Sequence, residues 1–202
     1  MSADGVERRL GEQLHDRLRS GDLTASEEIA RLFFPRLLTL LRRSRLAAGN
    51  TDLADTACAD AMLSYLRRPE QFKPESLSLF SYLKMAAFGD LSNAVASRAA
   101  QNMRVVELSE ERPEHMSDQG AVEDQLIAGF SSLPDRLDQL FPEEPDREML
   151  YLMMNGVRET ATYAAVLGVL DRPPNEQAAI VKRHKDRLKK TIQRNIDREE
   201  LG

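Results

Sequence analysis

The chain has 202 residues, of which 42 % are hydrophobic and 30 % charged, and its net charge is −5. This balance supports packed cores under a charged surface and excludes general disorder. A single cysteine excludes an internal disulfide framework and a multi-cysteine metal site. Because no apolar run is long enough to span a bilayer and the first residues lack the apolar core of a secretory signal, we expect a cytoplasmic protein without membrane insertion.

The composition predicts an all-α fold. Strong helix formers (Leu, Ala, Arg, Glu and Met) dominate the sequence, whereas alternating runs of β-branched and polar residues are missing. Charge is distributed unevenly, because thirteen acids stand against three bases in residues 107–148. We predict two small helical domains, at 8–104 and 146–198, joined by an acidic linker at 105–145 that is flexible apart from a short helix near 122–130.

The first helix of the predicted amino-terminal domain lies within residues 23–46. Its apolar side chains recur at three- and four-residue intervals, which indicates one buried face. Thr24 and Glu27 have the spacing of a capping box, in which each side chain hydrogen-bonds the backbone N–H of the other residue. Pro35 is expected to kink this helix, because it removes one amide donor and crowds the preceding turn.

Two more helices are predicted in this domain, from Asn50/Thr51 to about Arg68 and from Leu79 to about Ala100. Cys58 falls among small apolar residues, so we interpret it as a buried hydrophobic residue rather than a nucleophile. Aromatic and cationic side chains near the third helix suit base stacking on an unpaired strand, although core packing of the aromatic residues is the alternative. These candidates are Phe72, Tyr82, Lys84 and Arg98.

The predicted carboxyl-terminal domain has a helix-turn-helix pattern. A short helix at 146–155 is closed by Gly156, and a second helix at 159–167 is followed by Gly168. Gly168 stands four residues after Ala164. A small residue at the first of these positions lets two helices approach closely, and glycine at the second can adopt the left-handed turn conformation.

A long helix is then predicted from Glu176 to about Arg198, with Asn175 as its N-cap. Its apolar residues lie on one side, with His184 among them as an expected core histidine, and its cations spread over the other side. Such a helix suits the major groove of DNA; a solvated amphipathic helix or a coiled-coil arm is the alternative. The candidate DNA contacts are Asn175, Gln177, Lys182, Arg183, Lys185, Arg187, Lys189, Lys190 and Arg194.

The segments follow one another in a recognisable order. It begins with GDLTASEEIARLFFPRLLTLLRR, DLADTACADAMLSYLRR and SLSLFSYLKMAAFGDLSNAVASR, and ends with DREMLYLMMNG, TYAAVLG and NEQAAIVKRHKDRLKK. This order resembles regions 2.1 to 2.4 and region 4 of bacterial RNA polymerase sigma factors of the extracytoplasmic-function class. The chain departs from the family pattern at several places: Tyr82 stands for a tryptophan, Phe88 and Gly89 for an Arg-Asn pair, and Asn93 for an aspartate.

The resemblance implies a promoter-recognition subunit that binds core RNA polymerase at its β′ clamp and β flap. It also makes an anti-sigma factor a candidate partner. It implies that the second helix docks on polymerase, that region 2 captures the unpaired −10 strand, and that the last helix binds the −35 duplex of the promoter DNA. The residues so implied are Asp52, Leu53, Asp55 and Thr56 for polymerase, and Phe72, Lys73, Tyr82, Lys84, Asn93 and Arg98 for the −10 strand.

Two other classes of function remain open. One is a helical adaptor whose basic helix grips an acidic partner, and the other is a dimeric helix-turn-helix repressor with an effector domain. An enzyme is not expected, because no paired carboxylates, catalytic triad or metal-ligand spacing emerges, and we expect no cofactor and no metal.

Overall fold

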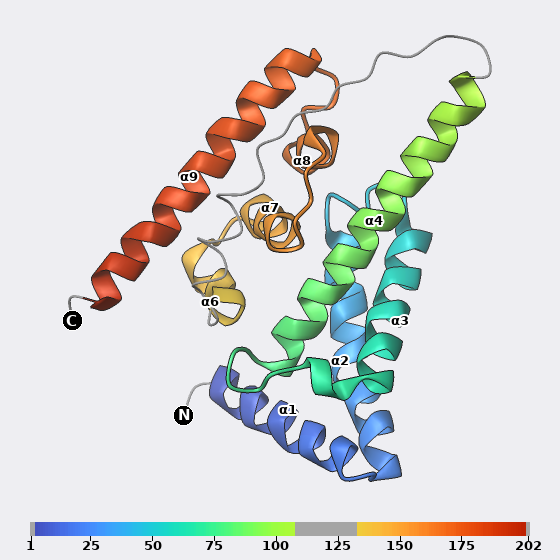
Figure 1. The fold of residues 1–202 in the computed structure, drawn as a ribbon, viewed down its shortest axis with the longest axis vertical. Helices are drawn as coiled ribbons and strands as arrows, with labels where there is room; N and C mark the ends of the chain where they lie inside the picture. The colour runs from blue at the N-terminus through green and yellow to red at the C-terminus, as the bar shows by residue number, and fades with distance from the viewer. Residues whose placement is uncertain (1–2, 108–132, 201–202) are drawn as a thin grey trace.

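The computed structural model describes residues 3–107 and 133–200, and these contain eight α-helices, one short 3-10 turn and no strand (Figure 1). The predicted all-α class is therefore confirmed for this part of the chain. The helices are α1 (Ala3–Arg19), α2 (Leu23–Arg43), α3 (Thr51–Arg67), α4 (Leu79–Glu107), α6 (Leu133–Leu140), α7 (Glu144–Met154), α8 (Thr160–Leu167) and α9 (Pro174–Glu200), with the 3-10 turn at Pro69–Gln71.

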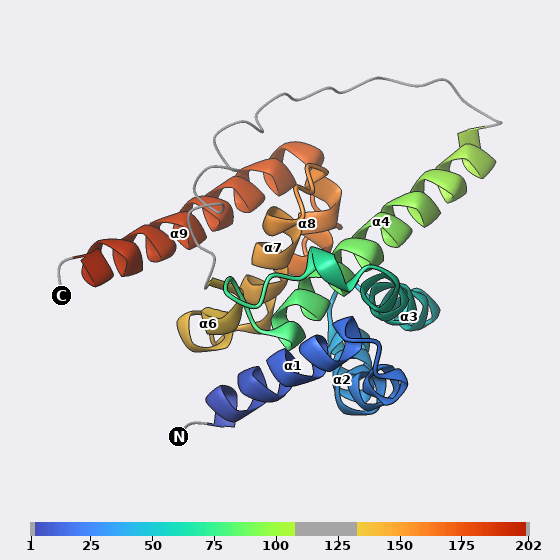
Figure 2. The ribbon, with the colours of Figure 1, turned by 60° about the horizontal axis from the view of Figure 1, so that its bottom comes forward.

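Helix α1 is an element that the sequence reasoning did not predict. It lies across one end of α2 and α4 (Figures 1 and 2) and buries Leu14 and His15 there. The Nδ1 atom of His15 lies 3.1 Å from the hydroxyl oxygen of Tyr65 on α3. The local signal for this helix is the four-residue spacing of Leu10, Leu14 and Leu18.

The start of α2 differs from the predicted capping box. Asp22 is the N-cap, and its carboxylate accepts hydrogen bonds from the Thr24 backbone N–H (2.9 Å) and the Thr24 hydroxyl (2.7 Å). Glu27 instead pairs with Arg31, one turn further along the helix. An ionised carboxylate is the stronger acceptor at the positive end of a helix, which explains why Asp22 caps α2. The helix then runs through Pro35 without ending.

Helices α3 and α4 begin where the sequence predicts, and α4 continues seven residues beyond the expected end to Glu107. Cys58 is fully buried in α3, as predicted, and its Sγ lies 3.8 Å from the backbone oxygen of Phe34. Burial raises the pKa of this thiol to about 11. A thiol in that state is a poor nucleophile, so its contribution is to packing.

Part of the predicted linker is a helix that packs on the amino-terminal half. Helix α6 buries Leu137, and Phe141 follows it into the core. The Asp135 carboxylate accepts hydrogen bonds from the backbone N–H and hydroxyl of Ser78, just before α4, at 2.7 to 3.0 Å. The short helix predicted at 122–130 lies outside the described residues.

Helices α7, α8 and α9 occupy the segments in which the sequence predicts a helix-turn-helix pattern. Ala164 is buried, and Gly168 ends α8 with φ of +68°, the left-handed conformation that the sequence predicts for it. Helix α9 begins at Pro174, so Asn175 lies in its first turn and is not the N-cap. Proline is favoured at the first helical position because its missing N–H has no partner there in any case.

One hydrophobic cluster runs through both predicted domains. Helix α7 lies between α4 and α9 in both ribbon views (Figures 1 and 2), and residues from α1–α4 and from α6–α9 belong to the same buried core. Phe88 of α4 stacks on Tyr151 of α7, with ring centroids 4.8 Å apart and an interplanar angle of 12°. The carboxyl-terminal helices are thus packed directly against the amino-terminal ones.

Candidate nucleic-acid interface

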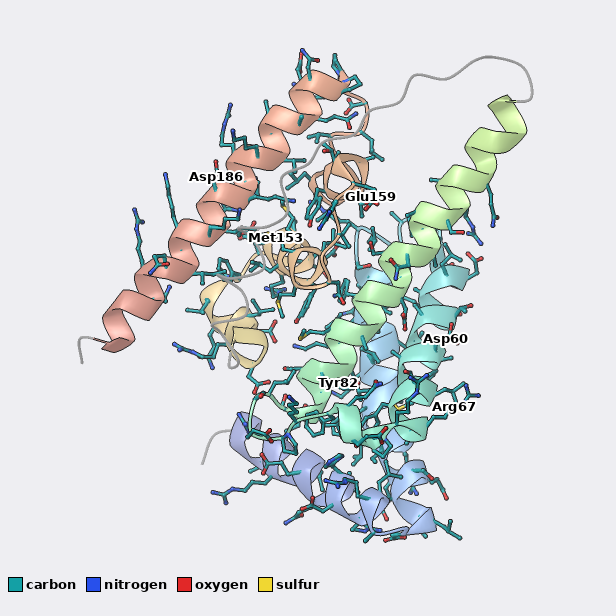
Figure 3. The ribbon with its side chains drawn as sticks, in the orientation of Figure 1. Asp60, Arg67, Tyr82, Met153, Glu159 and Asp186 are labelled. Carbon is teal, nitrogen blue, oxygen red and sulfur yellow. The ribbon has the colours of Figure 1, made fainter. Side chains whose placement is uncertain are left out.

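The strongest candidate interface is the outer face of α9. Val181, Leu188 and Ile192 are buried on the inner face of this helix, and Figure 3 shows long side chains along its outer flank, where Asp186 lies. Four of the predicted DNA contacts are exposed, and no ion pair or hydrogen bond joins their side chains to another side chain that the structure describes. They are Lys182, Arg183, Lys190 and Arg194, and we call them the basic face.

Two other predicted contacts of α9 bind within the molecule. Arg187 donates to a carboxylate oxygen of Asp146, a nearly buried residue of α7, and His184 Nε2 lies 3.1 Å from the same oxygen. Lys185 Nζ lies over the ring of Tyr163 in α8, 3.7 Å from its centroid. These contacts fix α9 on α7 and α8. The expectation that His184 is a core histidine is only partly met, since its side chain is 31 % exposed.

The polar residues at the start of α9 have different surroundings. Gln177 donates from Nε2 to the backbone oxygens of Leu170 and Arg172, at 3.0 and 2.7 Å, so its amide closes the turn between α8 and α9. Asn175 is exposed, and Lys189 is half-buried. Gln177 therefore positions the turn, whereas Asn175 faces solvent.

The candidates for the unpaired strand do not form one exposed surface. Phe72 is only 3 % exposed, and its ring packs against His15 and Tyr82, with centroids 5.0 and 5.5 Å apart. Lys84 is 4 % exposed and lies 3.7 Å from the Asp138 carboxylate. Both are thus inaccessible in this arrangement. Of the remaining candidates, Tyr82 is half-buried beside Phe72, Lys73 and Asn93 are exposed, and Arg98 is paired.

The residues assigned to polymerase docking lie on α3. Asp52 pairs with Arg98, and Asp55 accepts two hydrogen bonds of 2.6 Å from Arg42. These guanidinium groups lower the pKa of both carboxyl groups. Leu53 packs partly against the core, and Thr56 is exposed with its hydroxyl bonded to the Asp52 backbone oxygen. Both acids are therefore engaged within the molecule, and a partner that binds them has to compete with Arg98 and Arg42.

A cavity of about 250 Å³ lies between α1, α2, α4 and α6. Its charged lining is already paired: Arg8 with Asp135 at 3.2 Å, Arg36 with Glu7 at 2.8 Å, and Lys84 with Asp138 at 3.7 Å. Positive and negative charges therefore balance, and the lining favours neither an anion nor a cation. No group of three metal-ligating side chains occurs in the described part of the chain.

Sequence reasoning missed Glu148, a buried acid on α7. It is 1 % exposed, and its carboxylate accepts from the backbone N–H of Arg45 at 2.9 Å and of Leu46 at 3.3 Å. Burial raises the pKa of this carboxyl group to about 7. The one local signal for it is an acid directly before the apolar run Met149–Met153.

Comparison with known proteins adds no relative, since no protein-family model, curated protein or solved structure matches the chain. None of the helices within 3–107 and 133–200 combines the length and apolarity needed to cross a membrane. The function is therefore inferred from the residues and contacts of this chain.

Proposed function

We propose that the chain is a DNA-binding promoter-recognition protein of the sigma type, which places α9 in the major groove of duplex DNA and binds core RNA polymerase through α3. The observation that carries this proposal is the basic face of α9, with four exposed cations on the side opposite a buried apolar stripe. Proteins bind DNA by neutralising its phosphates with such side chains.

The dimensions of α9 support the same function. Its 27 residues extend over about 40 Å at 1.5 Å per residue, and an α-helix fits the major groove, which is about 12 Å wide. Helix α8 and the turn at Gly168 hold α9 in place, as the first helix and turn of a helix-turn-helix motif do for the second helix. In this proposal Lys182, Lys190 and Arg194 contact phosphates, and Asn175 and Arg183 are the candidates for base edges.

The test replaces three cations of the basic face: Lys182→Ala, Arg183→Ala and Lys190→Ala together. Binding of a labelled promoter-length duplex is measured by fluorescence anisotropy between 50 and 200 mM salt. We expect at least a tenfold loss of affinity, and the slope of log K against log salt should fall by about 2, since two phosphate contacts are lost and each contributes about 0.9.

A matched control removes three exposed arginines from elsewhere, with Arg9→Ala, Arg67→Ala and Arg68→Ala. This variant has the same net charge as the test variant, and Arg67 lies on the opposite side of the molecule from Asp186 (Figure 3). Affinity and slope should stay close to those of the unchanged protein. Equal losses in both variants would mean that DNA responds only to net charge, and the groove-binding role of α9 would be rejected.

A helical adaptor is the second candidate, and the internal pairing of Asp52 and Asp55 favours it, because polymerase docking has to compete with Arg98 and Arg42. Co-purification of the full chain with core RNA polymerase, followed by run-off transcription, separates the two. A promoter-recognition protein binds the core enzyme and starts transcripts at defined positions. An adaptor does neither, even when its basic face binds polyanions.

A further inference from the structure

The contact between α7 and the amino-terminal half is centred on a buried acid. Glu148 accepts hydrogen bonds from two successive backbone N–H groups, of Arg45 and Leu46, in the segment between α2 and α3. The Arg45 side chain makes a separate contact, in which it donates to the backbone oxygen of Val166 in α8, at 3.2 Å. One short segment of the amino-terminal half thus bonds two of the carboxyl-terminal helices.

A second point of contact lies further along α7. Asn155 donates from Nδ2 to the backbone oxygen of Met85 in α4, at 3.0 Å. Gly89, one helical turn later, lies so close that a Cβ atom added there would be 2.6 Å from Asn155 Oδ1. Glycine at this position of α4 therefore leaves room for the Asn155 side chain, which would have to move if a Cβ atom were present.

The packing of α6 and α7 on α4 buries a cation. Lys84 lies on the face of α4 that α6 and α7 cover: its Nζ is 3.7 Å from the Asp138 carboxylate and 5.8 Å from the Tyr151 ring centroid. The Asp138 side chain is itself 69 % exposed, so the charge pairing of Lys84 comes from a surface residue of α6. Separation of α6 and α7 from α4 would bring Lys84 to the surface together with Phe88, one turn later on α4, whose ring is 1 % exposed and stacked on Tyr151 of α7.

We propose that Glu148 and the Gly89–Asn155 contact latch the molecule in a closed state, and that release of this latch exposes a single-strand-binding surface on α4 containing Lys84 and Phe88. A cation beside an aromatic ring binds the phosphate and the base of one nucleotide. This inference rests on the proposed function, because it adds a regulation of its strand-binding step. In the closed state, the basic face of α9 remains exposed for duplex DNA.

The first experiment measures opening without DNA. Spin labels are attached at cysteines placed at Ser64 of α3 and Ala179 of α9, both exposed, in a Cys58→Ala background. Glu148→Ala removes the acceptor of two amides, and Gly89→Ala inserts a methyl group at the Asn155 contact. We expect both variants to move most of the population to longer and broader inter-label distances in pulsed EPR spectra.

Two features of these variants separate opening from unfolding. Alanine is a better helix former than glycine, so Gly89→Ala stabilises α4 itself while it disturbs the contact with α7. The matched control is Glu144→Ala, which removes an exposed acid one turn earlier on α7. Helical circular dichroism should be unchanged in all three variants. The inter-label distance should change in the first two alone.

The second experiment measures binding of a labelled 12-nucleotide single strand. We expect affinity to rise at least fivefold in the two open variants, and Lys84→Ala added to either should abolish the gain. Unchanged distances in both variants overturn the latch. Opening without tighter strand binding overturns the concealed surface. Opening with a Lys84-dependent gain, but without any binding of duplex DNA or core polymerase, supports the latch and rejects the proposed function.

Discussion

Glu148 combines full burial with an ionisable group, and this makes the stability of the molecule depend on pH near neutrality. Its carboxyl group has a pKa of about 7 in the folded chain, against an ordinary value of 4.5. Desolvation is the largest cause, and Glu144 raises the pKa further, whereas the N–H groups of Arg45 and Leu46 and the charge of Arg45 lower it. The folded state therefore holds a proton that the unfolded state releases between these two values.

The sign of the effect follows from this difference in bound protons. Because the folded pKa is the higher one, the stabilisation is fully present below pH 4.5 and is lost as the pH rises through 7. We expect the contribution of Glu148 to the free energy of unfolding in urea to fall by about 2 to 3 kcal/mol between pH 5 and pH 8, at 1.36 kcal/mol per pKa unit. Burial lowers the pKa of His15, so this residue contributes a change of the opposite sign in the same window. The acids with lowered pKa values, such as Asp22 and Glu28, have already ionised in this window.

Glu148→Gln is the control for this prediction. Glutamine has nearly the same shape and keeps one carbonyl oxygen for the backbone N–H donors, but it does not titrate. The fall in stability between pH 5 and pH 8 should be absent from this variant. Burial lowers the pKa of His15, so the change that remains should be a rise in stability with pH. If the slope of the unchanged protein persists in Glu148→Gln, another group is responsible for it, and the high pKa assigned to Glu148 is wrong.

At the scale of elements, the junction of α8 and α9 depends on one left-handed residue. Gly168 has φ of +68°, and a Cβ atom there would meet no atom closer than 3.6 Å, so the cost of a side chain comes from the backbone conformation. Gly168→Ala should lower the free energy of unfolding by about 1 kcal/mol, as measured by urea denaturation. Gly168→Asn should cost less, because asparagine tolerates this conformation better. Equal stability of Gly168→Ala and the unchanged protein would contradict this account.

The helices were largely predictable, because an amphipathic helix has a characteristic apolar spacing within a short stretch of sequence. Apolar spacing located α2, α3, α7 and α8 to within a few residues, and it located the start of α4 but not its end. The same pattern was available for α1, in Leu10, Leu14 and Leu18. The cap of α2 was misplaced from Asp22 to Thr24 because both residues suit an N-cap, and the choice depends on which one the chain leaves outside the helix.

The candidate site was less predictable, since burial of a helix face depends on distant segments. Periodicity identified the cationic side of α9 correctly for Lys182 and Arg183, which are exposed. It could not show that Arg187 is bound by Asp146, 41 residues earlier in the chain. Likewise, Lys84 looks like a surface cation in the sequence, and its burial results from α6 and α7, whose packing on α4 has no local signal.

At the scale of the whole molecule, the continuous core predicts cooperative unfolding. Residues of α4 and α7 share one buried cluster, and Phe88 stacks on Tyr151 across the boundary between the two predicted domains. The two halves therefore stabilise each other in the closed state. Differential scanning calorimetry should show one transition, with a van't Hoff enthalpy close to the calorimetric enthalpy.

Loss of the latch should separate this single transition into two. In Glu148→Ala, the amides of Arg45 and Leu46 lose their acceptor, so the closed state becomes less stable relative to an open state in which each half is folded. We expect two calorimetric transitions for this variant and one for Glu144→Ala. Two transitions in the unchanged protein would show that residues 8–104 and 146–198 unfold independently, and that the contact between α4 and α7 contributes too little to couple them. A single transition in Glu148→Ala would show that the apolar contact, led by Phe88 and Tyr151, is sufficient to hold the halves together.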